Sequence, residues 1–326
     1  MSTSSTDARQ SRGFRLKLPG QLSGIIGAFL IMVGIAAFVS PQFLTEYNMT
    51  IMARELAFIG IVAIAQGLLL LLGDIDVSIG AIAGLAGIVC AKLLVDFEFN
   101  PVLAIGLSIL AAALAGAING IIITTFNLNS LVVTIGMLSV YSGLNLFITQ
   151  GRTIVGLPEE VTFLGSSRFL GLPAPLWIML GLFVLVALLT TVTVYGRKLY
   201  AVGNSREAAR IVGISAQKVR IVAYSLAGAL AGTAGILMAF RLLSAQATLG
   251  QNWLLPSIAA PVIGGIATTG GIGTIWGALI GAAIMVVIGN IIVLGGVGIY
   301  LQQVVTGLIV VVAVVIDAVT RRFGGK

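Results

Sequence analysis

The sequence contains no histidine, a single cysteine and few charged residues, and these shortages exclude several kinds of function. There is no imidazole to act as a base or a ligand, and Cys90 alone forms neither a disulfide framework nor a cysteine metal site. A phosphate-binding P-loop requires a glycine directly before a lysine that Ser or Thr follows, and only the final residue, Lys326, follows a glycine. We therefore expect no metal site and no enzyme in this polypeptide. Any energy it uses must come from a gradient or another subunit.

Charged residues make up only 9% of the 326 positions and hydrophobic residues 58%, whereas about a quarter of the residues of a soluble domain are charged. Such a chain cannot cover a water-facing surface. Apolar runs of about 20 residues have the length that an α-helix needs to cross a bilayer. The sequence therefore predicts an all-α polytopic membrane protein with about ten transmembrane helices. The predicted spans are residues 21–39, 51–72, 79–95, 101–125, 131–149, 174–195, 221–240, 256–269, 274–294 and 299–319.

The basic residues cluster in an N-terminal tail (1–20), a middle segment (196–220) and a C-terminal tail (321–326). Lys and Arg favour the cytoplasmic side of a membrane, so we predict that all three segments are cytoplasmic. Six predicted spans precede the middle segment and four follow it, and both numbers are even, as this orientation requires. Residues 21–320 then form a single transmembrane domain. The net charge of +7 reflects orientation in a membrane, and we expect no nucleic-acid partner.

The middle basic segment contains the pattern of a short capped helix. Asn204 suits an N-cap, with Glu207 three residues later as in a capping box, and Gly213 suits the position just after a helix C-terminus. A helix over 205–212 among cytoplasmic bases favours a docking surface that transmits force from a cytoplasmic partner. A basic loop that only sets the topology explains the same pattern, and the residues alone leave both interpretations open.

Polar side chains interrupt several of the apolar runs. Asp74 and Asp76 lie between the second and third spans, and a carboxylate at membrane depth indicates a functional site. Asp76, followed by Ser78, is also placed to cap the third helix at its positive end. Amides bind sugar hydroxyls but also hold helices together, so each amide has two interpretations. The candidate residues of a translocation pathway are Asp76, Asn119, Asn145, Asn290 and Gln302.

Glycine and proline follow two different patterns. Glycines four residues apart, such as Gly116 and Gly120, let helices approach closely and indicate architecture. Between 256 and 269, prolines and paired glycines instead predict a broken or re-entrant helix. Membranes tolerate such a break only inside protein or beside a cavity, and transport sites are commonly built from them. A plain loop is the alternative. The predicted helix-breaking or gating residues are Pro256, Pro261, Gly264 and Gly265.

Three parts of the chain carry sequence motifs of a known family. They are IDVSIG (75–80), YAVGNSREAARIVGIS (200–215), and IAAPVIGG with TTGGIGTIWGALIG within 258–281. At these segments the chain resembles the permease subunits of ribose-type ABC sugar importers, over roughly residues 20–320 and in the family's order and spacing. The chain departs from the family at Leu254-Leu255-Pro256, where Glu-Leu is common, and at Pro261, where Val is common. It also has Asp74 where glycine is common.

The resemblance implies a subunit of the bacterial plasma (inner) membrane that pairs with a second permease subunit and binds no cofactor itself. A cytoplasmic ABC ATPase would hold ATP and magnesium, and an extracytoplasmic sugar-binding protein would deliver the substrate. The resemblance also implies the ten-helix fold of cobalamin-type importers with an inverted repeat, of which GAIAGLAGI (80–88) and GALAGTAGI (228–236) are faint echoes. The implied coupling residues are Asn204, Ser205, Arg206, Glu207, Ala208, Ala209 and Gly213.

The expected function is translocation of a small sugar, a ribose-type monosaccharide or related polyol. Related permeases move nucleosides, furanosyl signals or amino acids, so these are alternative substrates. An alternative of another class is a self-contained, proton-coupled secondary transporter in which Asp74 or Asp76 carries the proton. A non-transporting scaffold would have no use for carboxylates and broken helices at membrane depth.

Overall fold

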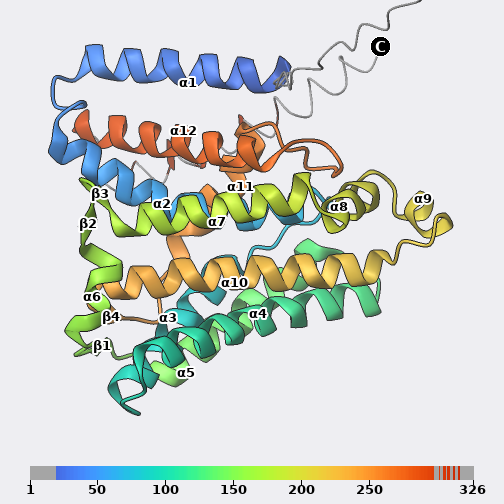
Figure 1. Cartoon of the computed structure of the whole chain (residues 1–326), viewed down its shortest axis with the longest axis horizontal. Coiled ribbons are helices and arrows are strands. Elements are labelled where there is room, and N and C mark those ends of the chain that lie inside the picture. The colour runs from blue at the N-terminus through green and yellow to red at the C-terminus, as the bar shows by residue number, and fades with distance from the viewer. Residues whose placement is uncertain are drawn as a thin grey trace, which may run out of the picture.

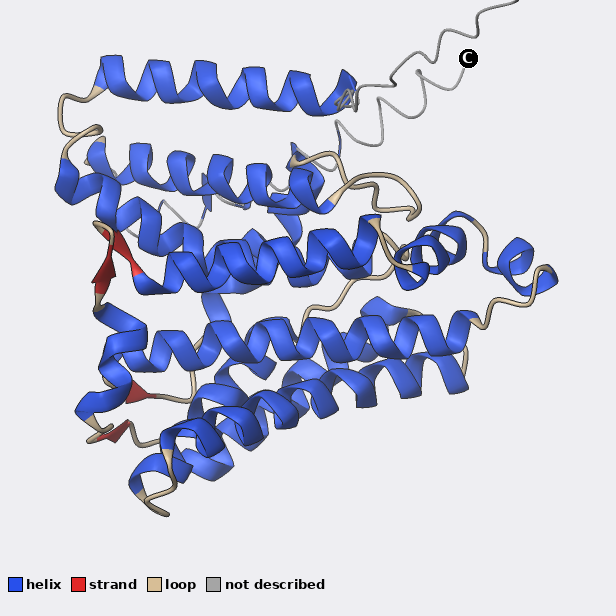
Figure 2. Cartoon of the chain, in the orientation of Figure 1, coloured by secondary structure: helices blue, strands red, loops and turns tan. Residues whose placement is uncertain are grey.

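The computed structural model describes residues 20–296 and isolated positions between 301 and 315. Within 20–296 the chain is almost entirely helical (Figure 2), with two small antiparallel strand pairs, β1–β4 and β2–β3. The elements are α1 (Gly20–Val39), α2 (Glu46–Leu70), α3 (Ile79–Val95), α4 (Pro101–Thr125), α5 (Ser130–Thr149), β1 (Ile154–Val155), α6 (Glu159–Ser166), β2 (Arg168–Phe169), β3 (Leu172–Pro173), α7 (Ala174–Thr191), α8 (Val194–Asn204), α9 (Arg206–Ile211), α10 (Ala216–Leu242), β4 (Ser244–Ala245), the 3-10 helix η1 (Gln251–Trp253), α11 (Leu254–Ile263) and α12 (Ile275–Leu294).

The helices confirm a multi-pass membrane protein and correct several predicted boundaries. In the described part of the chain, α2, α4, α5, α7, α10 and α12 are long and apolar enough to cross a membrane. The predicted span 174–195 ends at Thr191, because Thr193 caps the separate helix α8 by accepting a hydrogen bond from the Gly196 N–H. The predicted span 256–269 is the ten-residue helix α11. Most of the predicted span 299–319 lies outside the described residues, so the count of ten remains a prediction.

The two ends of the helical bundle differ in what they carry. Figure 1 shows α8, α9 and the beginning of α10 at one end, where α1 also begins. The opposite end carries α6 and the two strand pairs. The middle basic segment and the start of α1 therefore lie at the same end of the molecule, as the distribution of Lys and Arg predicts.

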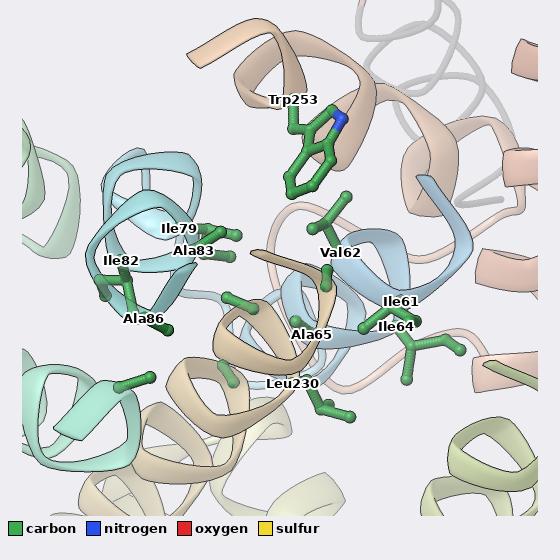
Figure 3. Packing of buried hydrophobic residues seen from close by; sticks show 14 of the residues in the cluster. Ile61, Val62, Ile64, Ala65, Ile79, Ile82, Ala83, Ala86, Leu230 and Trp253 are labelled. Atoms are coloured by element: carbon green, nitrogen blue, oxygen red, sulfur yellow. The ribbon is translucent and has the colours of Figure 1, made fainter. Parts of the chain in front are cut away.

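The helix α10 is the centre of the core, packed against α2, α3 and α4. Its apolar side chains contact those of α2 and α3 beside the indole ring of Trp253 in η1, as Figure 3 shows. The ring of Phe58 stacks on Trp253 with a centroid distance of 5.9 Å. The side chains labelled in the figure are Ile61, Val62, Ile64, Ala65, Ile79, Ile82, Ala83, Ala86, Leu230 and Trp253.

Glycine lets the backbones of these helices touch. A Cβ added at Gly116 of α4 would overlap the Tyr224 carbonyl of α10, and one at Gly235 of α10 would overlap the Ala83 carbonyl of α3. The interpretation of the glycine spacing as architecture is confirmed at these crossings. The two segments that echo each other in sequence, 80–88 and 228–236, thus contact one another in the core.

We predict that Gly116→Ala lowers the thermal stability of the detergent-solubilised protein, whereas Gly106→Ala on the same helix leaves it unchanged. The added methyl group at Gly116 meets backbone that cannot move aside, at an expected cost of about 1–3 kcal/mol. A methyl group at Gly106 meets nothing within 4 Å. Equal melting temperatures for the two variants would contradict the observed α4–α10 crossing.

Candidate functional site: two helix breaks joined by α8 and α9

The first helix break is the irregular segment 71–78 between α2 and α3, and it is held by buried hydrogen bonds. Asp76 is 1% exposed. Its Oδ1 accepts hydrogen bonds from the Ser78 N–H (2.7 Å) and the Ser78 hydroxyl (2.6 Å). Gln66 of α2, with its amide oriented to satisfy both groups, donates to the Asp76 carbonyl (3.0 Å) and accepts from the Asp76 N–H (3.2 Å). The N-cap residue of α3 is therefore Ser78 and not Asp76, whose carboxylate instead holds Ser78 in place just before the helix begins.

The Asp76 carboxylate also joins a polar chain that crosses three helices. The Asn119 amide of α4 donates to Asp76 Oδ2 (3.1 Å) and to Ser78 Oγ (2.9 Å). The Tyr141 hydroxyl of α5 lies 3.0 Å from Asn119 Oδ1 and donates to the Ala115 carbonyl (2.8 Å). The structure therefore brings two predicted pathway residues together. Tyr141 was missed by sequence reasoning, although a tyrosine inside an apolar run is itself a signal, since a buried hydroxyl needs a partner.

Asp74 is held by two arginines from distant parts of the chain. Arg220, in the first turns of α10, donates to both carboxylate oxygens of Asp74 at 2.7 and 2.8 Å. Arg206, the first residue of α9, donates to Asp74 Oδ1 at 3.1 Å. Asp74 and Arg220 are buried, whereas the Arg206 side chain is 42% exposed. This ion-pair cluster was missed because Asp74 lies more than 130 positions from each arginine and because both arginines matched the pattern of topology-setting bases.

The second helix break follows α11 and meets the first. The prediction that prolines break this helix is wrong, because α11 continues through both: Pro256 lies in its first turn and Pro261 lies inside it. The break comes at the glycines. The helix ends at Ile263, Gly264 is its C-cap, and Gly265 has a φ of +82°, a conformation that glycine adopts without strain. In the loop that follows, the Gly271 N–H donates to the Leu71 carbonyl of the first break at 2.9 Å. The two irregular segments therefore satisfy each other's backbone inside the protein.

Helix α8 rests directly on this junction. A Cβ added at Gly203 would overlap the Leu71 carbonyl and lie 2.7 Å from the Gly271 nitrogen, so α8 contacts both breaks through its backbone. The Tyr200 hydroxyl donates to the Gly273 carbonyl at 2.9 Å. Burial raises the pKa of the Tyr200 hydroxyl, which favours the protonated form that this hydrogen bond requires.

The short helix α9 is capped at both ends, with one correction to the sequence prediction. Asn204 is not the N-cap, because α8 continues through it. Ser205 is the extended residue between the helices, and its hydroxyl accepts from the Ala208 N–H at 3.1 Å. Gly213, with a φ of +79°, occupies the predicted position after the C-terminus. The Gly213 N–H donates to the Arg210 carbonyl (3.0 Å), and the next N–H donates to the Ala209 carbonyl (2.9 Å), as in a Schellman motif.

Charged and apolar groups on α9 are exposed together. Arg206, Glu207 and Ala208 face solvent, whereas Ala209 is buried against the bundle. Ile211 is 85% exposed and Val212 is 71% exposed. An open cavity of about 560 Å³ lies between α9 and the start of α10. Its lining includes the side chains of Thr124, Asn127, Arg206, Glu207, Arg210, Gln217 and Arg220.

The remaining candidate pathway residues do not join the Asp76 cluster. The Asn145 amide donates to the Ala81 carbonyl of α3 at 3.1 Å, and among the described residues its Oδ1 has no hydrogen-bond partner. Asn290 of α12 exchanges hydrogen bonds of 3.0 and 2.7 Å with Asn48 of α2. Gln302 lies outside the described residues.

Asn290 lines a second cavity, of about 690 Å³, near the connection between α1 and α2. The α1–α2 connection, which contributes Gln42 and Thr45 to the lining, lies at the end of the bundle opposite α9 (Figure 1). Apolar side chains from α2 and α12 form part of its wall, and Pro256 of α11 also contributes. The polar residues of the lining are Gln42, Thr45, Tyr47, Asn48, Glu55 and Asn290.

Irregular backbone buried within a bundle of apolar helices indicates a membrane transport protein. Such breaks are tolerated at membrane depth only inside protein or beside a cavity, and they are typical of membrane transport proteins. Residues 48–314 match the family described as "Branched-chain amino acid transport system / permease component". The chain belongs to this family of transport-system permease components.

Curated relatives confirm the resemblance identified in the sequence. The ribose import permease protein RbsC of Bacillus subtilis (strain 168) is 36% identical over 317 residues, which cover 96% of this chain and 98% of the relative. RbsC of Escherichia coli (strain K12) is 34% identical over 89% of this chain and 91% of its own length. The L-arabinose ABC transporter permease protein AraH of Azospirillum brasilense is 34% identical over 92% of this chain and 88% of its own length. No solved structure matches this chain significantly.

We predict that Gly203→Ala loosens the junction between α8 and the two breaks. The added methyl group overlaps the Leu71 carbonyl, so α8 must move away. Hydrogen–deuterium exchange should then accelerate at Gly271, whose N–H is bonded to that carbonyl. Gly181→Ala on α7 is the control, because its methyl group meets nothing within 4 Å. Unchanged exchange at Gly271 in the Gly203 variant would contradict the described junction.

Proposed function

We propose that this protein is the permease subunit of an ABC importer for a small sugar, most closely a ribose-type monosaccharide. The observation that carries the proposal is the capped helix α9, whose neighbour α8 rests on both helix breaks. A cytoplasmic ABC ATPase docks on α9 and moves it when ATP binds, and the permease itself is not catalytic. The names of the ribose and arabinose relatives support the substrate class.

The proposal includes an orientation and an assembly. The end of the bundle with α9 faces the cytoplasm of a bacterial cell, because Lys and Arg gather there, and both chain termini lie on that side. Ten helices with the inverted repeat of cobalamin-type importers complete the fold. A second permease subunit pairs with this one in the inner membrane, and a sugar-binding protein docks at the opposite end, where α6 and the strand pairs lie.

The proposed docking surface for the ATPase is the exposed face of α9 with its two caps. Exposed arginines and an exposed glutamate give it both charges, and Ile211 and Val212 supply apolar area. Such a mixture is typical of protein interfaces. The residues proposed for coupling are Asn204, Ser205, Arg206, Glu207, Ala208, Ala209 and Gly213.

The cavity between α2, α11 and α12 is the proposed entry of the sugar. Its volume of about 690 Å³ lies in the range of about 300–1,000 Å³ that small-molecule pockets occupy. Amides, a carboxylate and a tyrosine among apolar walls can hydrogen-bond sugar hydroxyls and contact the sugar ring. Asn290 and Pro256 line this cavity. Asp76 and Asn119 instead hold the first helix break, so we assign Asp76 and Asn119 a positioning role.

The proton-coupled secondary transporter is less well supported. Both oxygens of the Asp74 carboxylate accept hydrogen bonds from guanidinium groups, and both oxygens of Asp76 are also hydrogen-bonded. Neither carboxylate presents a free oxygen to a water-filled path. The relatives from Bacillus subtilis, Escherichia coli and Azospirillum brasilense are also named as import permeases and an ABC transporter permease.

We predict that an ABC ATPase co-purifies with the tagged protein from its native membrane in mild detergent. The double variant Arg206→Glu/Gly213→Trp should lose the ATPase, because it reverses a charge on α9 and fills the position of its C-terminal cap. Retention of the fold is checked by gel filtration. A well-folded parent that elutes alone and still transports sugar in vesicles would overturn the importer function.

We predict that Asn290→Ala lowers ribose uptake at least about tenfold, the effect of 1.4 kcal/mol, while the bound ATPase is retained. Removal of the amide deletes a hydrogen-bonding group from the cavity and leaves Asn48 without that partner. Asn145→Ala, which removes an amide outside this cavity, should reduce uptake less. The opposite ranking would place the sugar path between α3 and α5.

A further inference from the structure

The Asp74 carboxylate joins three elements that the proposed function requires to move together. It lies in the first helix break, and its two arginines come from α9 and α10. Resting on the proposed importer function, we propose that Asp74 is a positioning residue that transmits the displacement of α9 by the ATPase to the break between α2 and α3.

The ion pair between Asp74 and Arg220 stays formed when α9 moves. Both side chains are almost fully buried, at 2% and 4% exposed, and the guanidinium binds both carboxylate oxygens at 2.7 and 2.8 Å. Removing one partner of a buried pair leaves an uncompensated charge, which is strongly destabilising. The first break and the start of α10 are therefore fixed to each other.

The ion pair between Asp74 and Arg206 is the one that can open. The Arg206 side chain is 42% exposed and makes a single contact of 3.1 Å with Asp74, whereas the buried Arg220 binds both carboxylate oxygens. The Arg206 contact can break and re-form as α9 moves. Arg206 is the first residue of α9, so a displacement of that helix that breaks this contact leaves Asp74 paired with Arg220 alone.

A change at Asp74 reaches the rest of the bundle through the neighbouring backbone. The N–H groups of Ile75 and Val77 donate to the hydroxyls of Ser130 and Thr134 on α5, each at 3.3 Å. Asp76 holds the start of α3 and the Asn119 amide of α4. The segment that contains Asp74 is thus bonded to α3, α4 and α5, and these amide protons provide a direct readout of its state.

The test compares Arg206→Gln with Lys218→Gln in the purified permease–ATPase complex. Lys218 lies in the first turn of α10, outside the proposed docking surface, is exposed and forms no ion pair within the described part of the chain. Hydrogen–deuterium exchange of residues 71–78 is measured without nucleotide and with ATP plus vanadate. We expect a nucleotide-dependent change in the parent and in Lys218→Gln, and its reduction at least about threefold in Arg206→Gln.

Two results would overturn the inference. One is a nucleotide-dependent change that is equal in Arg206→Gln and Lys218→Gln, or that is absent from the parent. The other is a loss of bound ATPase in Arg206→Gln with no effect on exchange in the complex that remains, since Arg206 would then act in docking alone. Failure of the parent to bind any ATPase would instead overturn the proposed function.

A double-mutant cycle tests whether Arg206 acts through Asp74. The effect of Arg206→Gln should disappear in the Asp74→Asn background, because residues that act through one contact are not additive. If Asp74→Asn does not fold, the cycle is made with Asp74→Asn/Arg220→Met, which removes the buried charge pair together. An undiminished effect of Arg206→Gln in either background would contradict transmission through Asp74.

Discussion

The structure depends on the need to satisfy every backbone group that is buried in an apolar interior. Two segments leave the helical conformation there, and a free N–H or carbonyl at membrane depth costs several kcal/mol. The chain meets this need by placing one break against the other, so that the Gly271 N–H binds the Leu71 carbonyl. Gln66, Ser130 and Thr134 satisfy further groups of the first break.

The two aspartates of the first break have separate roles that follow from their partners. Among the described residues, the Asp76 carboxylate accepts hydrogen bonds from neutral groups, and it organises the start of α3 with α4. The hydrogen-bond donors to the Asp74 carboxylate are arginines, which come from the end of the bundle that carries α8 and α9. One carboxylate therefore stabilises the interior, while the other connects it to the surface where an ATPase is proposed to dock.

Much of the fold is predictable from the sequence, because apolar runs and caps are local signals. The helix ends near Val39, Val95, Thr125 and Thr149 follow directly from such runs. The site is less predictable, because its contacts join residues that are distant in sequence. The Asp74 pairs are an example, and so is the N-cap at Ser205, which depended on how far α8 extends. The cavity lined by Asn290 could not be predicted, because the sequence does not show that α2 and α12 are neighbours.

The glycine crossings of α10 determine which parts of the protein can move independently. Side chains between two helices normally act as a deformable layer, since they change rotamer when one helix slides past another. At Gly116 and Gly235 no such layer exists, because backbone meets backbone. We therefore expect α3, α4 and α10 to move as one rigid body. A hinge is to be sought at the edges of this block rather than within it.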